Sequence, residues 1–194
     1  MKPARVKGDK MRIIAGRYRR LRLKTIDGLQ TRPTLDRVRE SFFSKIGPSF
    51  EGQRVLDLFA GSGSIGFEVL SRGGEYVVLN DQHPKVFQLL IDNAAFLKIP
   101  NQQYKLLKRE ALKALKYCQE ENLRFDWVYL DPPYHHKEME EIFAQLPTIL
   151  KDQGLVYYEL DQQTEIQAYE NFREVDRFIY PRTVIVVYKV ESTS

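Results

Sequence analysis

The segment Asp131-Pro132-Pro133-Tyr134 could do chemistry, and it directly follows the apolar run Phe125 to Leu130. Two prolines fix φ and remove two backbone N–H donors, so this loop is stiff and presents acceptors. The Asp131 carboxylate and the Pro132 carbonyl could each accept one N–H of an exocyclic amine on a nucleic-acid base. The nitrogen would turn toward tetrahedral geometry, which frees its lone pair to attack a methyl group. Tyr134 would stack on the base, as aromatic side chains do on unstacked bases.

A glycine-rich turn follows another apolar run, in the segment Val55-Leu56-Asp57-Leu58-Phe59-Ala60-Gly61-Ser62-Gly63-Ser64-Ile65-Gly66. Glycines let the backbone approach a ligand closely, and open α/β sheets bind ligands at the carboxyl ends of their strands. The three glycines also match the dinucleotide pattern G-x-G-x-x-G, with Asp81 20 residues after the first of them. Asp57 argues against a dinucleotide, because its carboxylate would repel a pyrophosphate and suits a cation. The α-ammonium group of S-adenosylmethionine is such a cation.

Two more acids stand at the ends of predicted strands. Asp81 could accept hydrogen bonds from both ribose hydroxyls of the cofactor, and Glu110 could accept one from the adenine amino group. Three of the four acids, Asp57, Glu110 and Asp131, also have a purely structural interpretation. Glu110 could be a first-turn acid stabilised by the helix dipole, while Asp57 and Asp131 could cap their turns.

The elements that must position these motifs alternate between strands and helices from residue 53 onward. Strands are predicted near 54–59, 76–81, 103–107, 125–131 and 153–160. Helices are predicted near 64–72, 84–97, 110–120 and 136–150. This alternation implies βαβ units and a parallel sheet covered on both faces. The last two runs, 172–180 and 183–190, are joined by a turn around Pro181 that is too short for a parallel crossover. The prediction is an α/β, Rossmann-like sheet, mostly parallel, that ends in an antiparallel hairpin.

Charge is distributed unevenly along the chain. Residues 1–50 hold 14 Lys or Arg against 4 Asp or Glu, and residues 51–194 hold 16 against 22. Such a step suggests an arm that binds a polyanion, joined to a body with a different task. The candidate RNA-binding residues are Arg17, Arg19, Arg20, Arg22, Arg32 and Arg37. A solvated basic tail without a partner is the alternative.

The basic region has predictable structure of its own. Residues 1–10 are expected to be disordered, and residues 11–24 to form a small basic β-hairpin around Gly16. Thr34 is expected to cap a helix that runs to about Ile46.

The cysteine and histidine residues argue against several kinds of reaction and site. The single cysteine, Cys118, permits no intramolecular disulfide and favours a reducing cytoplasm. Its place in a predicted helix argues against a cysteine-nucleophile route to carbon-5 methylation of pyrimidines. His83, His135 and His136 have no metal-ligand spacing, so no metal is expected. We expect no membrane partner, because no apolar run approaches the roughly 20 residues that a membrane span needs.

The glycine motif and the Asp-Pro-Pro-Tyr motif together resemble those of the class I amino-methyltransferases. Three N-terminal blocks narrow the resemblance to the RsmD-type family: Met11-Arg12-Ile13-Ile14-Ala15-Gly16, Thr31-Arg32-Pro33-Thr34 and Asp36-Arg37-Val38-Arg39-Glu40. The resemblance covers roughly residues 11 to 190. It implies a bacterial enzyme that methylates N2 of a guanine in 16S ribosomal RNA, on an assembling small ribosomal subunit.

Site roles follow from the resemblance by position. The residues implied to hold the methionine end of S-adenosylmethionine are Asp57, Phe59, Gly61 and Gly63. Asp81 is implied to hold the ribose, and residues 131–134 the target guanine. The ribose acid is often Glu in this family, and the acid at the position of Glu110 is usually Asp. Both departures keep the charge, so we expect adjusted contacts.

Three other functions stay open at this point. Motif spacing does not separate this activity from DNA adenine-N6 or cytosine-N4 methylation, although DNA enzymes usually carry an added target-recognition region. An inactive RNA-binding assembly factor is opposed by the intact Asp57 and Asp131, and an NAD oxidoreductase lacks a hydride-transfer residue. We expect a cytoplasmic monomer with a tail (1–10), a basic hairpin-and-helix extension (11–50) and a methyltransferase domain (51–194).

Overall fold

The computed structural model describes residues 11–26, 34–133 and 138–191. The predicted disorder of residues 1–10 and the predicted roles of Arg32 and Tyr134 lie outside these ranges, as do His135 and His136. In chain order the helices are α1 (Thr34–Ile46), α2 (Ser64–Ser71), α3 (Pro84–Leu97), α4 (Ala111–Glu120) and α5 (Met139–Gln145). The strands are β1 (Arg54–Asp57), β2 (Tyr76–Asn80), β3 (Tyr104–Leu107), β4 (Phe125–Leu130), β5 (Leu150–Asp161), β6 (Phe172–Ile179) and β7 (Thr183–Val190). Short 3₁₀ turns cover Asn101–Gln103 and Leu146–Thr148.

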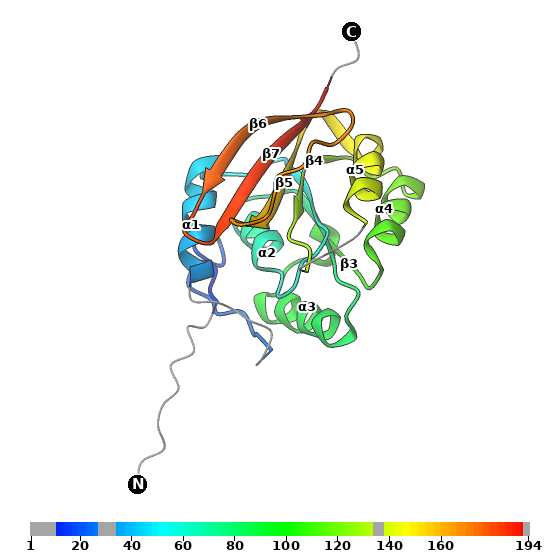
Figure 1. The fold of residues 1–194 in the computed structure, drawn as a ribbon. Coiled ribbons are helices and arrows are strands. Elements are labelled where there is room, and N and C mark those ends of the chain that lie inside the picture. Colours follow the sequence, from blue (N-terminus) through cyan, green and yellow to red (C-terminus); the bar gives the residue numbers. More distant parts are fainter. Residues whose placement is uncertain (1–10, 27–33, 134–137, 192–194) are drawn as a thin grey trace.

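The strands form one seven-stranded sheet in the order β3-β2-β1-β4-β5-β7-β6 (Figure 1). The first five strands are parallel, and β7 runs antiparallel between β5 and β6. The backbones of Tyr180 and Thr183 bond to each other across Pro181, which closes the turn from β6 to β7. The predicted fold class, a mostly parallel sheet that ends in an antiparallel hairpin, is confirmed.

Two apolar layers cover the two faces of the sheet. Successive strand residues alternate between them, as the pleat of a strand requires: Trp127 and Tyr129 face α1, α2 and α3, whereas Val128 and Leu130 face α4 and α5. Phe42 of α1 is fully buried and packs edge-on against Tyr129, with ring centroids 5.4 Å apart. No helix in the described ranges is long and apolar enough to cross a bilayer.

The predicted helix over 136–150 was too long, and the strand predicted from 153 begins earlier. Helix α5 ends at Gln145, and β5 starts at Leu150. The register explains the error: Phe125 of β4 pairs with Leu150, but Trp127 pairs with Leu155, so β5 carries extra residues in a bulge. Apolar residues at the end of α5, in the 3₁₀ turn and at the start of β5 therefore imitate one helical stripe.

The basic hairpin predicted for residues 11–24 is present as a short one. An antiparallel bridge joins Arg12 to Arg22, and the N–H groups of Ile13 and Leu23 donate to the carbonyls of Leu21 and Met11, each at 2.9 Å. The loop between the two arms packs on α2. The Arg17 N–H donates to the Ser71 carbonyl at 2.7 Å. At Gly16, which has φ +79°, a Cβ atom would lie 1.8 Å from that same carbonyl oxygen. Only glycine allows this approach.

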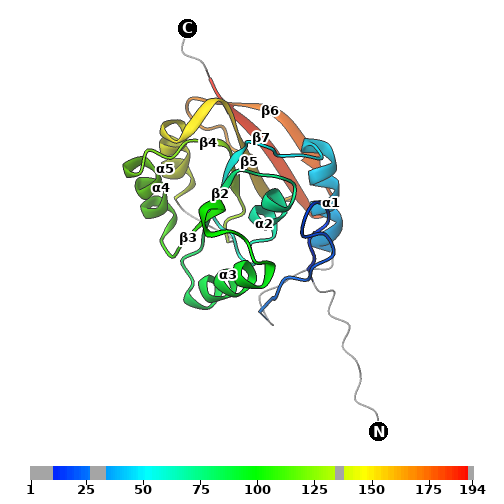
Figure 2. The same cartoon turned by 180° about the vertical axis from the view of Figure 1, so that it is seen from behind.

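Buried polar groups attach the N-terminal segment (residues 11–26) to the helices. The fully buried Glu68 of α2 accepts the N–H of Ile14 at 2.7 Å and the N–H of Ala15 at 2.9 Å. Asn93 of α3 accepts the Lys24 N–H at 2.8 Å and donates back to the Lys24 carbonyl at 3.2 Å. Figure 2 shows the segment running beside α1 and reaching α3. The segment is therefore a packed part of the fold.

Candidate active site

A cavity of about 1010 Å³ opens at the carboxyl ends of the parallel strands. Residues from the glycine turn (57–66) and from the Asp131 loop (Asp131–Pro133) both line it. Met11, Thr25 and Ile26 of the N-terminal segment and Phe42 of α1 complete its wall. The two motifs that the sequence singles out, more than 60 residues apart, therefore face one shared space.

Most of the predicted catalytic and cofactor-binding residues line this cavity. They are Phe59, Gly61, Asp81, Glu110, Asp131, Pro132 and Pro133. Asp57 and Gly63 are buried and do not belong to the lining.

Asp57 and Gly63 stabilise the conformation of the glycine turn from buried positions. The Asp57 carboxylate accepts the Gly66 N–H at 3.2 Å, and its burial raises the pKa of the carboxyl to about 7. Gly63 precedes α2 with φ +79°, and a Cβ atom there would lie 2.4 Å from the Phe67 ring. Both residues hold the turn in place, and their contact with a cofactor stays a prediction.

Asp81 and Asn80 connect the ends of three strands. Asp81 accepts the Gly61 N–H at 3.2 Å and the His83 N–H at 2.9 Å, and burial raises the pKa of its carboxyl. The buried Asn80, which the sequence analysis missed, donates to the carbonyls of Leu58 and Arg109, each at 3.0 Å. This network fixes the rim of the cavity where a ribose is predicted to lie.

Glu110 lies at the entrance of α4 and on the cavity wall. It precedes α4 as the N-cap residue without a side-chain capping hydrogen bond, and its exposed carboxylate pairs with Lys113 at 2.7 Å. Because Glu110 lines the cavity, its predicted contact with the adenine amino group stays a prediction that the geometry allows.

Glu159 and Tyr129 are cavity residues that the sequence analysis did not select. The Tyr129 hydroxyl donates a short hydrogen bond to the Glu159 carboxylate. Burial raises the pKa of both groups. The available signal was Glu159 itself, an acid that interrupts the otherwise uncharged run Leu155 to Leu160.

The cavity carries a surplus of negative charge. Five carboxylate side chains line it, against two arginines, Arg39 and Arg109. The carboxylates belong to Asp81, Glu110, Asp131, Glu138 and Glu159. Across the described ranges no group of three or more His, Cys, Asp or Glu could hold a metal ion. An acid-rich cavity suits an organic cation such as a sulfonium with an ammonium group, and opposes a pyrophosphate.

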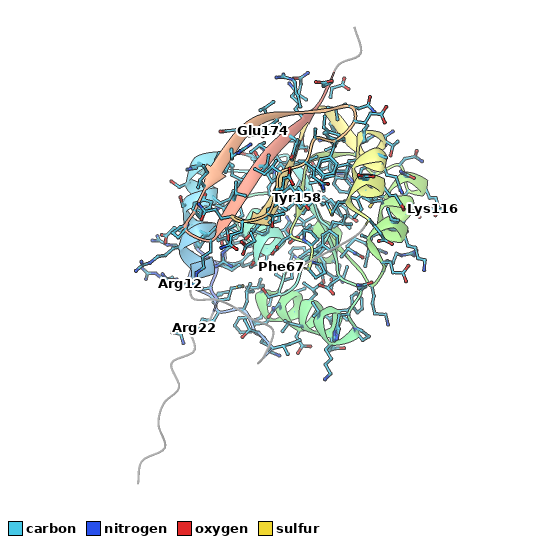
Figure 3. All side chains as sticks on the ribbon, in the orientation of Figure 1. Arg12, Arg22, Phe67, Lys116, Tyr158 and Glu174 are labelled. Atoms are coloured by element: carbon cyan, nitrogen blue, oxygen red, sulfur yellow. The ribbon has the colours of Figure 1, made fainter. Side chains whose placement is uncertain are left out.

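The candidate RNA-binding arginines lie outside the cavity. Arg17, Arg19, Arg20, Arg22 and Arg37 are all exposed, and none lines the cavity. Figure 3 places Arg12 and Arg22 together at the edge of the molecule below α1. Positive charge therefore gathers on the outer side of the same N-terminal segment whose inner side closes the cavity.

A family model described as "conserved hypothetical protein 95" matches residues 11–189. The chain belongs to this family. It is similar to the ribosomal RNA small subunit methyltransferase D of Haemophilus influenzae, with 36% identity over 86% of each chain. The enzyme of the same name from Escherichia coli K12 is 34% identical over 81% of this chain and 78% of its own.

A solved structure from Escherichia coli, described as a candidate methyltransferase, superposes with a TM-score of 0.79. It is 28% identical and covers 94% of this chain and 98% of its own. The family membership predicted from the N-terminal blocks is thereby confirmed, and the sheet is that of the class I methyltransferases.

We expect the pH dependence of S-adenosylmethionine binding to report on Asp57. With its pKa raised to about 7, much of this carboxyl is protonated in the empty site, and a nearby cation favours the ionised form. Binding then releases a proton, so affinity should rise about tenfold from pH 5.5 to pH 7. Stability of the empty protein has the opposite sign: this group's contribution is full below the unfolded pKa and lost as pH rises through about 7.

Calorimetric titration of the wild type and of Asp57→Asn at the two pH values tests this expectation. Asparagine has no proton to release, so any slope left in the variant reports Asp81 and the other acids. If cofactor affinity changes equally with pH in the two proteins, Asp57 stabilises the glycine turn and does not contact the cofactor.

Proposed function

We propose that this protein transfers a methyl group from S-adenosylmethionine to the exocyclic N2 of a guanine in 16S ribosomal RNA. The single observation that carries the proposal is the cavity shared by the glycine turn and the Asp131 loop, with its surplus of carboxylates. The names of the relatives support a ribosomal RNA substrate. We further propose that the target lies in an assembling small subunit, and that the protein acts as a monomer in the bacterial cytoplasm.

The Asp131 loop would prepare the amine for attack. The lone pair of an exocyclic amine is delocalised into the ring, so the nitrogen is a poor nucleophile. When the Asp131 carboxylate and the Pro132 carbonyl each accept one N–H, the lone pair turns toward the methyl donor. N2 would then be able to take the methyl group that the cofactor supplies on its sulfonium centre, and the electron pair of the broken carbon–sulfur bond would stay with sulfur. Asp131 would accept the proton that N2 sheds.

The other cavity residues would hold the cofactor, which supplies an activated methyl group on a sulfonium centre. We propose that the glycine turn, with Asp57, Phe59, Gly61 and Gly63, takes the methionine end. Asp81 would accept the ribose hydroxyls, and Glu110 the adenine amino group. The negative lining fits the positive charge of this cofactor.

The labelled methyl group identifies the activity. The protein is incubated with S-adenosylmethionine labelled in its methyl group and with small ribosomal subunits, free ribosomal RNA or DNA. Digestion and chromatography of the nucleosides then show which base carries the label. We expect N2-methylguanosine from subunits, whereas labelled N6-methyladenine or N4-methylcytosine from DNA would replace this function with the alternative.

We propose that residues 11–50 form an RNA-binding extension of a methyltransferase domain over residues 51–194. Replacing Arg17, Arg19, Arg20 and Arg22 by alanine should then weaken RNA binding about 10- to 100-fold near 0.1 M salt. Each lost phosphate contact should also lower the slope of log affinity against log salt by about 0.7–0.9. Cofactor affinity should stay unchanged, because these exposed arginines do not line the cavity.

The matched control is Lys116→Ala with Arg173→Ala, which removes exposed positive charge on other elements. Lys116 lies on the opposite side of the molecule from Arg12 and Arg22 (Figure 3). Filter binding at several salt concentrations compares the variants. An unchanged salt slope in the four-arginine variant would remove the arm from RNA recognition.

A further inference from the structure

Glu159 lies beside the Asp131 loop at the end of β5. Strands β4 and β5 run parallel, and the last pair in their register joins Leu130 to Tyr158. Asp131 directly follows β4, Glu159 directly follows Tyr158 in β5, and the charges of both act on Tyr129, so the two residues lie close together. Both line the cavity. A base amine held by Asp131 would therefore lie close to the Glu159 carboxylate.

Tyr129 fixes the position of the Glu159 carboxylate. The tyrosine is 2% exposed, packs against Phe42 and donates its hydroxyl proton to Glu159. That bond occupies one of about four lone-pair sites of a carboxylate, so Glu159 keeps the capacity to accept another N–H from the cavity. A carboxylate is an expensive group to leave half-buried beside other acids. A donor from a ligand would offset that cost.

The three acceptors on this side of the cavity have a consequence for base choice. Asp131, Glu159 and, as proposed above, the Pro132 carbonyl offer lone pairs, and none of these three groups is an ionised donor. Guanine is the base that presents an exocyclic amine next to a ring N–H, namely N2 and N1. Adenine and cytosine place a ring nitrogen with a lone pair next to their amine, and a carboxylate repels that lone pair. Sites that hydrogen-bond a substrate donor reject analogues without it, because buried polar groups are left unpaired.

We propose that Glu159 is the specificity-determining residue of the site, which accepts the N1–H of the target guanine, and that Tyr129 positions it. This inference rests on the proposed function and deepens it, since it names the contact that selects guanine over the other amino bases.

The wild-type protein alone can test the contact. The guanosine identified by methyl labelling is replaced in a ligated RNA by 2-aminopurine riboside, which keeps the amine on C2 but has a lone pair at N1. We expect kcat/KM to fall about 10- to 100-fold, as for loss of a hydrogen bond to a charged group. An RNA with 6-thioguanosine keeps both donors and controls for the change at position 6. Equal kcat/KM for guanosine and 2-aminopurine would overturn the proposal.

Variants test whether Glu159 is the residue that discriminates between guanosine and 2-aminopurine. In Glu159→Gln an amide N–H can face the N1 lone pair of 2-aminopurine. The ratio of kcat/KM for guanosine to kcat/KM for 2-aminopurine should therefore fall at least about fivefold. Most of this fall should come from slower methylation of guanosine. Tyr129→Phe, which loosens the carboxylate without removing it, should give an intermediate ratio. The matched control is Glu174→Gln on β6, an exposed glutamate that pairs with Arg177 at 2.7 Å and does not line the cavity (Figure 3 labels it).

The possible outcomes distinguish the role of Glu159 from the proposed methyltransferase function. N2-methylguanosine formed by Glu159→Gln with the wild-type ratio would overturn the role of Glu159 and leave the proposed function standing. A loss of S-adenosylmethionine affinity in Glu159→Gln, with the ratio unchanged, would assign the carboxylate to the cofactor instead. If the wild type forms no N2-methylguanosine, the proposed function fails, and this inference fails with it.

Discussion

Replacing Asp131 by alanine should lower kcat for methyl transfer by about 10²- to 10³-fold while the affinity for S-adenosylmethionine stays within about twofold. The size follows from removing one pre-positioned polar group that acts on the reacting nitrogen. Asp131 lies in the loop after β4, and the glycine turn that would hold the cofactor lies after β1. Asp131→Asn should recover part of the rate, because the amide oxygen still accepts one N–H but cannot take the proton as readily.

Single-turnover kinetics with labelled cofactor measure the rate, and calorimetric titration measures cofactor binding. Asp152→Ala, at an exposed position near the start of β5, is the matched control and should keep the full rate. A normal single-turnover rate in Asp131→Ala would exclude the carboxylate from the transfer step. A rate loss that matches an equal loss of cofactor affinity would make Asp131 a binding residue.

Replacing Glu68 by glutamine should lower the free energy of unfolding by about 3–5 kcal/mol. Glu68 is fully buried and accepts three donors: the N–H groups of Ile14 and Ala15, and the Arg72 Nε–H at 2.8 Å. The amide of glutamine turns its own N–H toward a donor and leaves the Arg72 guanidinium, whose side chain is 8% exposed, without a counter-charge. A loss of about 3 kcal/mol corresponds to a fall in Tm of about 6–12 °C for a domain of this size.

Urea unfolding measures the loss, and hydrogen exchange at the Ile14 and Ala15 amides shows where it acts. Glu120→Gln is the control, because Glu120 is an exposed partner of Lys116 at 3.9 Å and should change stability little. Since the N-terminal segment forms part of the cavity wall, Glu68→Gln should also bind cofactor more weakly. Wild-type stability together with protected amides would show that the other contacts of the segment hold it without the Glu68 charge.

The central sheet could be predicted from sequence because its signals are local. Apolar runs that end in Asp57, Asp81 and Asp131 mark strands whose carboxyl ends meet, and the short turn at Pro181 requires an antiparallel pair. The bulge at the start of β5 could not be predicted, because the register of β4 against β5 is a tertiary property. The packing of the N-terminal segment on α2 could not be predicted for the same reason: N–H groups of the segment pair with Glu68 and the Ser71 carbonyl, more than 50 residues away.

The site residues that directly follow predicted strands could be predicted from the sequence. Phe59, Gly61, Asp81 and the Asp131 loop line the cavity as their spacing indicated. Asn80 and Tyr129 were missed, because inside a strand they look like ordinary sheet residues. Their contacts reach other strands: Asn80 bonds to carbonyls after β1 and β3, and Tyr129 to β5.

The acid-rich lining of the cavity also bears on turnover. Once the methyl group has left, the sulfur of the spent donor is a neutral thioether, so the ligand carries one positive charge fewer in the field of the five carboxylates. The long-range attraction of the acid-rich wall is therefore weaker for the by-product than for the fresh donor. The reaction itself removes the charge that retained the ligand, and this favours exchange of the by-product for a new donor.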